Sequence, residues 1–201
     1  MRSEQNSGSK PTIDGVMRVL GISGSLRASS INSALLRAAV RLAPPEVTLT
    51  VFHGVSELPL FNPDLEASLP PQVSVLHEAV AASDALLLAS PEYAHGVTGS
   101  IKNALDWLVS FAPFAGKHVA VLNASPRAHH ADAALRETLK TMSAVIVEAA
   151  SISIPLLGAN LSEEGMVRDP LASSAVKRCL FALHSAFVRG QSEQGPASPL
   201  P

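Results

Sequence analysis

The stretch VMRVLGISGSLRASSIN, residues 16–32, decides the fold, because it joins an apolar run to a loop of small residues and then to a helix pattern. The apolar run 16–23 predicts a buried strand. The segment 31–42 that follows has helical periodicity. Its apolar face is formed by Ile31, Leu35, Ala38 and Leu42. The stretch therefore predicts a strand, a loop and a helix whose apolar face packs on the sheet.

The same alternation of strand and helix patterns continues along the chain. Apolar runs predict further strands at 47–55, 84–90, 118–125 and 144–152. Helix-period segments lie at 71–82, 100–111, 132–142 and 171–187. The first, third and fourth strands are apolar on both faces, as in sheets that helices cover on either side. The predicted fold class is α/β, a doubly wound five-stranded parallel sheet with helices on both faces.

Length and composition favour one domain. The chain has 201 residues, of which 47% are hydrophobic, enough to bury a sizeable core. We expect a single domain over 16–189, with disordered tails at 1–15, which is polar, and at 190–201, which is rich in Pro, Gly and Ser.

Charge and cysteine content exclude several classes of protein. Fifteen Lys and Arg stand against seventeen Asp and Glu, so no basic field favours nucleic acid or acidic lipid as a partner. No apolar run reaches the roughly 18 residues of a membrane span. The lone Cys179 cannot form an intrachain disulfide and is expected to pack in the last helix. With no signal-peptide pattern at the N-terminus, the sequence predicts a cytoplasmic protein.

The loop at 21–32, GISGSLRASSIN, suits a phosphate group. Small residues let backbone N–H groups approach an anion, the hydroxyls can donate to its oxygens, and Arg27 adds a guanidinium. The helix N-terminus contributes a favourable dipole. The two common nucleotide motifs, G-x-x-x-x-G-K-[ST] and G-x-G-x-x-G, are absent, and a monophosphate is expected. The alternative is an ordinary turn in which Ser29 or Ser30 caps the helix.

The loop after the third strand brings a recognisable pattern. Together, GSLRASSIN (24–32) and SPEYAHGVTGSIKNALDW (90–107) resemble the NAD(P)H-dependent FMN reductase family of flavodoxin-like proteins, which includes quinone, azo-dye and chromate reductases. The resemblance implies bound FMN and the flavodoxin-like strand order 2-1-3-4-5. It places around the FMN phosphate Ser23, Ser25, Arg27, Ser30 and Asn32. It places along the isoalloxazine ring Pro91, Glu92, Tyr93, Ala94 and His95.

The sequence departs from this family at two loops. Many relatives have Asn after the Tyr, where this chain has Ala94 followed by His95. We expect backbone donors or His95 to take over that contact; the alternative is that His95 is a surface residue. Relatives commonly have a glycine-rich stretch at 123–130, which this chain lacks, so the resemblance supports Ser125 and Arg127 as neighbours of the flavin or the nicotinamide nucleotide only weakly.

Two further expectations concern this third loop. Arg127 is a candidate for binding the extra phosphate of NADPH, with a solvated surface Arg as the alternative. His129 and His130 are expected to begin a helix rather than to bind metal, and no metal site is predicted.

The segment 100–111 carries a signal for oligomerisation. One stripe should face the sheet: Ile101, Ala104, Leu105 and Leu108. Trp107 and Phe111 would then form a second apolar patch, which predicts a subunit interface. The alternative is that Trp107 packs under loops of its own chain. Family members are typically dimers or tetramers, so the resemblance implies a homodimer or homotetramer.

The functional prediction is an oxidoreductase. The resemblance implies hydride transfer from NADPH or NADH to FMN, followed by electron transfer to a small acceptor such as free flavin, a quinone, an azo compound or a metal oxyanion. No side chain is assigned as catalytic acid or base. One alternative is a flavodoxin-type electron carrier. Another is a serine hydrolase, because residues 21–25 narrowly miss G-x-S-x-G, with Ser23 as nucleophile.

Overall fold

A computed structural model describes residues 15–156 and 162–193. Its strands form one parallel sheet in the order β2-β1-β3-β4-β5, with β6 also paired to β4. The strands are β1 (Met17–Ser23), β2 (Val47–Phe52), β3 (Ala85–Ala89), β4 (His118–Asn123), β5 (Val145–Ile146) and β6 (Ile152–Ser153). The helices are α1 (Ile31–Leu42), α2 (Pro71–Ala82), α3 (Gly99–Asp106), α4 (His129–Thr141), α5 (Glu163–Arg168) and α6 (Pro170–Glu193). Short 3₁₀ turns are η1 (Gly54–Glu57), η2 (Pro63–Leu65), η3 (Ala112–Phe114) and η4 (Glu148–Ala150).

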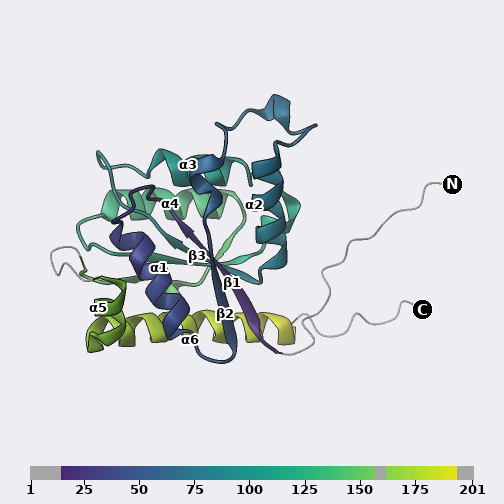
Figure 1. Ribbon diagram of the computed structural model, residues 1–201. Coiled ribbons are helices and arrows are strands. Elements are labelled where there is room, and N and C mark those ends of the chain that lie inside the picture. The colour runs from purple at the N-terminus through teal and green to yellow at the C-terminus, as the bar shows by residue number, and fades with distance from the viewer. Residues whose placement is uncertain (1–14, 157–161, 194–201) are drawn as a thin grey trace, which may run out of the picture.

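Helices cover both faces of the sheet, as predicted. Figure 1 shows α1, α5 and α6 on one side and α2, α3 and α4 on the other. Neighbouring strand residues point to opposite faces, so Val19 and Leu87 belong to the core under α1 and α6. Leu20 and Leu88 belong to the core under α2, α3 and α4. The predicted α/β fold class and strand order are thus confirmed.

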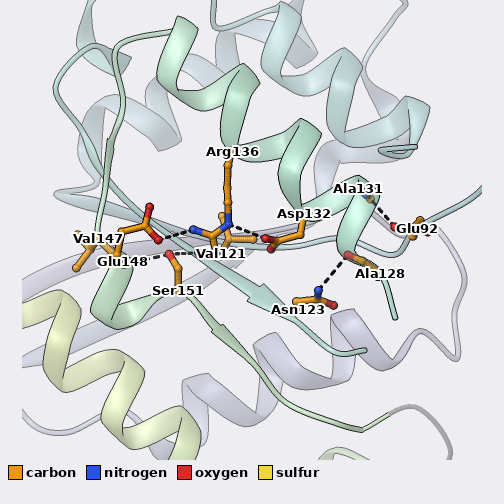
Figure 2. Close-up of polar contacts among 10 residues, drawn as sticks. All are labelled: Glu92, Val121, Asn123, Ala128, Ala131, Asp132, Arg136, Val147, Glu148 and Ser151. Carbon is orange, nitrogen blue, oxygen red and sulfur yellow. Dashed lines mark hydrogen bonds and ion pairs between the residues drawn. The ribbon is translucent and has the colours of Figure 1, made fainter. Parts of the chain in front are cut away.

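The fifth strand differs from its prediction. The sequence predicts one continuous strand over 144–152, but the structure has only β5, the turn η4 and then β6. The reason is a side-chain contact, in which the Ser151 hydroxyl accepts from the Val121 N–H at 3.1 Å and donates to the Val147 carbonyl at 3.0 Å. A hydroxyl thereby replaces one rung of the backbone ladder (Figure 2).

The prediction that Trp107 lies at a subunit interface is wrong. Helix α3 ends at Asp106 rather than continuing to 111, and Trp107 is 1% exposed. Its indole N–H donates to the Pro59 carbonyl at 2.8 Å, and the Phe61 ring meets it edge-on at 5.0 Å. Phe111 is half-buried and stacks on His77. Trp107 therefore packs under loops of its own chain, because the segment with Pro59 and Phe61 covers it.

The last helix extends further than the sequence predicts. Helix α6 continues to Glu193, past residue 189, where the domain was expected to end. The predicted tails lie largely outside the described residues, which exclude 1–14 and 194–201. The assignment of 16–189 as a single domain stays a prediction. Within 15–156 and 162–193, no helix is both long and apolar enough to cross a bilayer.

Candidate functional site

A cavity of about 720 Å³ opens where the loops after β1, β3 and β4 meet. This is the carboxyl edge of a parallel sheet, where ligands of open α/β folds bind. Its volume lies within the usual range of small-molecule sites, roughly 300–1,000 Å³. The predicted site residues that line it are Ser25, Arg27, Ser30, Asn32, Pro91, Glu92, Tyr93, Ser125 and Arg127. The structure therefore brings the three predicted loops together around one cavity.

Three predicted residues lie near the cavity without lining it. They are Ser23, Ala94 and His95. Ser23 is 8% exposed, and its hydroxyl shares a hydrogen bond of 2.8 Å with the Ser33 hydroxyl. A serine hydroxyl is no general base, so this contact gives Ser23 no hydrolase-type activation. Ser23 instead braces the loop against the first turn of α1.

The N-terminus of α1 has features of both interpretations of the first loop, the phosphate site and the ordinary helix cap. Ser30 caps the helix, since its hydroxyl accepts from the Ser33 N–H at 3.3 Å. Ser30 also lines the cavity, together with the exposed Arg27. A capped helix N-terminus beside hydroxyls and a guanidinium is a site that favours an anion.

Asn32 is the polar group of this loop whose bonding is incomplete. It is 4% exposed and lines the cavity, yet its Oδ1 has no hydrogen-bond partner among the described residues. A buried amide oxygen without a donor is unfavourable by about 1–3 kcal/mol. Ribityl hydroxyls can donate to this oxygen. In the flipped orientation of the amide, its NH₂ can donate to a phosphate. The site therefore fits the FMN that the sequence implies.

The first and second loops are packed closely together at Gly24. A Cβ on Gly24 would collide with the side chain of Ser90, so only glycine fits there. The Gly24 carbonyl accepts from the hydroxyls of Thr98, at 2.6 Å, and Ser100, at 2.7 Å. The loop after β1 is thereby held against the start of α3.

The second loop contains a tight turn in an unusual conformation. Tyr93 and Gly96 form an antiparallel bridge, with backbone hydrogen bonds of 3.2 and 3.0 Å. Between them, Ala94 has φ 50° and His95 has φ 59°, as in a type I′ turn. Asn or Gly suits such positions, whereas a left-handed residue with an ordinary Cβ costs about 1–2 kcal/mol. Ala94, where many relatives have Asn, therefore strains the turn in addition to removing a side-chain amide.

Glu92 connects this turn to α4. Its side chain is 12% exposed; one carboxylate oxygen accepts from the Ala131 N–H at 2.8 Å (Figure 2), and the other lies 3.0 Å from His95 Nδ1. The Ala131 hydrogen bond, with the His95 hydrogen bond and the charge of His130 adding to it, lowers the pKa of Glu92. His95 itself points outward, with 77% of its side chain exposed. Its predicted contact with the flavin stays a prediction.

The third loop is ordered by Asn123 at the end of β4. Its Oδ1 accepts from the Ser125 N–H at 2.9 Å, and its NH₂ donates to the Ala128 carbonyl at 3.1 Å (Figure 2). Helix α4 then begins at His129, as predicted. Arg127 is exposed at the cavity wall. No three His, Cys, Asp or Glu side chains of the described part of the chain are grouped to hold a metal ion.

Sequence reasoning missed several residues of the cavity wall. Ser90 directly follows β3, and Asn123 is the last residue of β4. Their position at the carboxyl ends of parallel strands is the signal that could have identified them. Leu156 also lines the cavity. It reaches the site only because the chain after the broken fifth strand returns to β4, where its N–H donates to the Ala124 carbonyl.

Comparisons with known proteins agree with this geometry. The family model described as NADPH-dependent FMN reductase matches residues 17–156. An NAD(P)H-dependent FMN reductase of Pseudomonas aeruginosa is 36% identical over 173 residues, covering 83% of this chain and 93% of that protein. A quinone reductase of Escherichia coli K12 is 32% identical over 113 residues, which are 54% of this chain and 60% of that protein.

Solved structures show the same likeness. The flavoenzyme NAD(P)H:acceptor oxidoreductase FerB of Paracoccus denitrificans superimposes with a TM-score of 0.70 at 26% identity, over 87% of this chain and 98% of that one. The matched family region contains the three loops that form the cavity. Fold, cavity and sequence likeness converge, and the chain belongs to the NADPH-dependent FMN reductase family.

Proposed function

We propose that FMN binds in the cavity of about 720 Å³ and that a reduced nicotinamide nucleotide and a small acceptor use its open side in turn. The observation that carries this proposal is Asn32, a buried amide of the phosphate-type loop whose oxygen has no partner within the described residues. A quinone is the acceptor that the names of several relatives support, including those of Escherichia coli and Arabidopsis thaliana.

The residues of this chain supply binding and orientation. Bound FMN supplies the ring that accepts hydride and passes electrons on. Arg27, Ser25 and Ser30 line the part of the cavity next to the α1 N-terminus, where a phosphate would be neutralised. Tyr93 is 59% exposed at the cavity mouth, where it can contact a ring or a bound acceptor. No general acid or base is required, because solvent can protonate the reduced acceptor.

NADPH rather than NADH is the proposed donor, and Arg127 is the support for it. The side chain is exposed on the third loop at the cavity wall, where its guanidinium can meet the additional phosphate. We expect Arg127→Gln to raise KM for NADPH several-fold and to leave KM for NADH unchanged. Equal effects on both nucleotides would contradict this role.

The proposed assembly is a homodimer or homotetramer in the cytoplasm. The assembly is supported by the large side chains of Leu26 and Tyr93, which are 60% and 59% exposed beside the cavity. A second subunit could cover them. The unpaired Cys179 fits a reducing compartment. Light scattering during gel filtration measures the assembly, and a monomer at micromolar concentration would refute it.

An absorbance titration tests the central proposal. FMN is added to the purified protein, the excess is removed by desalting, and NADPH is then added without oxygen. Retained flavin bands that bleach on addition of NADPH are the expected result. Retained bands that NADPH leaves unchanged would identify an electron carrier instead. A protein that retains no flavin would lack the proposed site, and labelling of Ser23 by a phosphonate would then support a hydrolase.

A further inference from the structure

The turn Tyr93–Gly96 has a conformation that its own residues do not favour. Ala94 and His95 both lie in the left-handed region, with φ of 50° and 59°. Alanine has neither the freedom of glycine nor the side-chain amide that lets asparagine adopt this region. Something outside the turn must therefore help to hold it, because the two backbone hydrogen bonds within it are available in any sequence.

Glu92 is placed to provide that support. It precedes the turn directly, and its carboxylate reaches both the Ala131 N–H, at 2.8 Å, and His95 Nδ1, at 3.0 Å. The first contact uses an N–H of the first turn of α4, which has no partner inside the helix. A carboxylate at a helix N-terminus is also favoured by the helix dipole.

The helix at the other end of this contact is itself firmly held. Arg136 joins Asp132, at 2.6 Å, to Glu148, at 2.7 Å, and so ties α4 to η4 (Figure 2). Leu135 and Leu139 are buried in the core beneath the helix. Helix α4 is thus a fixed support to which a neighbouring loop can be attached.

We propose that Glu92 is a positioning residue for flavin binding: through Ala131 and His95 it holds the strained turn, and hence Tyr93, in place at the cavity mouth. The proposal rests on the proposed function, since it assumes that FMN occupies this cavity. Glu92 also lines the cavity, so the rival explanation is a direct contact between its carboxylate and the ligand. In the positioning role both carboxylate oxygens remain bonded to the protein.

Four variants separate these explanations: Glu92→Ala, Glu92→Gln, Ala94→Gly and the double variant Glu92→Ala/Ala94→Gly. Alanine removes both contacts, whereas glutamine keeps one acceptor for Ala131 and one donor for His95. Glycine at 94 removes the strain at that position, leaves His95 as it is, and adds no group that can touch the flavin. Glu137→Ala is the matched control, because Glu137 is an exposed carboxylate on α4.

The first readout is amide hydrogen exchange in the flavin-free protein, at Ala131 and Gly96. Positioning predicts faster exchange at both amides in Glu92→Ala, near-normal exchange in Glu92→Gln, and recovery at Gly96 alone in the double variant. Glu137→Ala should match the wild type. Unchanged exchange at Gly96 in Glu92→Ala would overturn the proposal.

The second readout is the FMN dissociation constant from quenching of flavin fluorescence. Loss of hydrogen bonds to a charged group predicts a rise of about tenfold for Glu92→Ala, and the double variant should recover the part of it that is due to strain at Ala94. A rise that Ala94→Gly does not reduce would show direct contact and overturn the positioning role. If the wild type binds no FMN, the proposed function fails, and exchange at Gly96 still decides whether Glu92 holds the turn.

Discussion

Single side chains account for most of what this site can recognise, and Asn32 is the clearest case. Its buried Oδ1 lacks a donor within the described residues, so an added group in the cavity can complete its bonding. The sequence pointed to this residue through the resemblance of residues 24–32 to the FMN reductase family, which places Asn32 near the phosphate. It could not show that the amide would be buried, since burial follows from how β1, α1 and the third loop pack together.

Asn32→Asp tests this role in flavin binding. The change conserves shape but places a negative charge beside the expected phosphate, so the FMN dissociation constant should rise by more than about tenfold. Binding of riboflavin, which lacks the phosphate, should weaken less. Asn62→Asp is the control, because Asn62 caps the exposed turn η2. Equal losses for both ligands would mean that the phosphate does not lie near Asn32.

Glu92 gives the fold a defined dependence on pH. Its pKa in the folded protein is lowered, chiefly by the Ala131 N–H and then by His95 and His130. The carboxylate therefore stabilises the fold above the pKa of the unfolded chain, about 4.3, and this contribution is lost as the pH falls through the lower folded value. Urea unfolding of wild type and Glu92→Gln between neutral and acidic pH should give free energies that converge at low pH. A constant difference would contradict the assignment.

Cys179 is expected to be chemically inert in the native protein. Burial raises the pKa of its thiol to about 12, and the side chain is fully buried in the core under α6. The thiolate is the reactive form, so a disulfide reagent near pH 8 should label no thiol in the folded protein and one thiol per chain in urea. Rapid labelling of the native protein would show that α6 opens locally.

At the scale of elements, prediction succeeded where the signal lies in local sequence. Helix α2 begins at Pro71 and ends at Ala82, as its helical pattern indicated. The prediction of a continuous fifth strand failed because the interruption depends on the hydrogen bond between the Val121 N–H and the Ser151 hydroxyl. This contact joins two separate segments, and the hydrophobic pattern along the chain does not reveal it. Helix α3 was predicted too long for a related reason, since the apolar pattern continues through Trp107 and Leu108 whether or not the helix does.

Ser151→Ala tests the interruption of the fifth strand. The buried Val121 N–H loses its acceptor, and an unpaired buried N–H costs about 1–3 kcal/mol of unfolding free energy. Urea denaturation measures the loss. Ser153→Ala, at an exposed position of β6, should change stability by less than about 0.5 kcal/mol. Equal stabilities of the two variants would show that another group takes over the contact.

At the scale of the whole molecule, the inward position of Trp107 removes it from any assembly surface. The indole is 1% exposed and bonded to Pro59, and it is the single tryptophan of the chain. Its emission should therefore lie at short wavelength, resist acrylamide quenching, and stay constant on dilution from micromolar to nanomolar protein. The emission should shift only when urea unfolds the chain. A shift of the emission on dilution alone would show that Trp107 lies at a subunit interface.

The two-residue turn between Tyr93 and Gly96 also limits how this enzyme can be re-engineered. Because the bridge closes over only Ala94 and His95, an inserted or deleted residue would shift the register of everything from Gly96 to the start of α3. Libraries aimed at new acceptors should therefore vary the identity of residues 93–95 and conserve chain length. Within such a library, glycine and asparagine at 94 should be enriched in thermostable clones, whatever acceptor is selected.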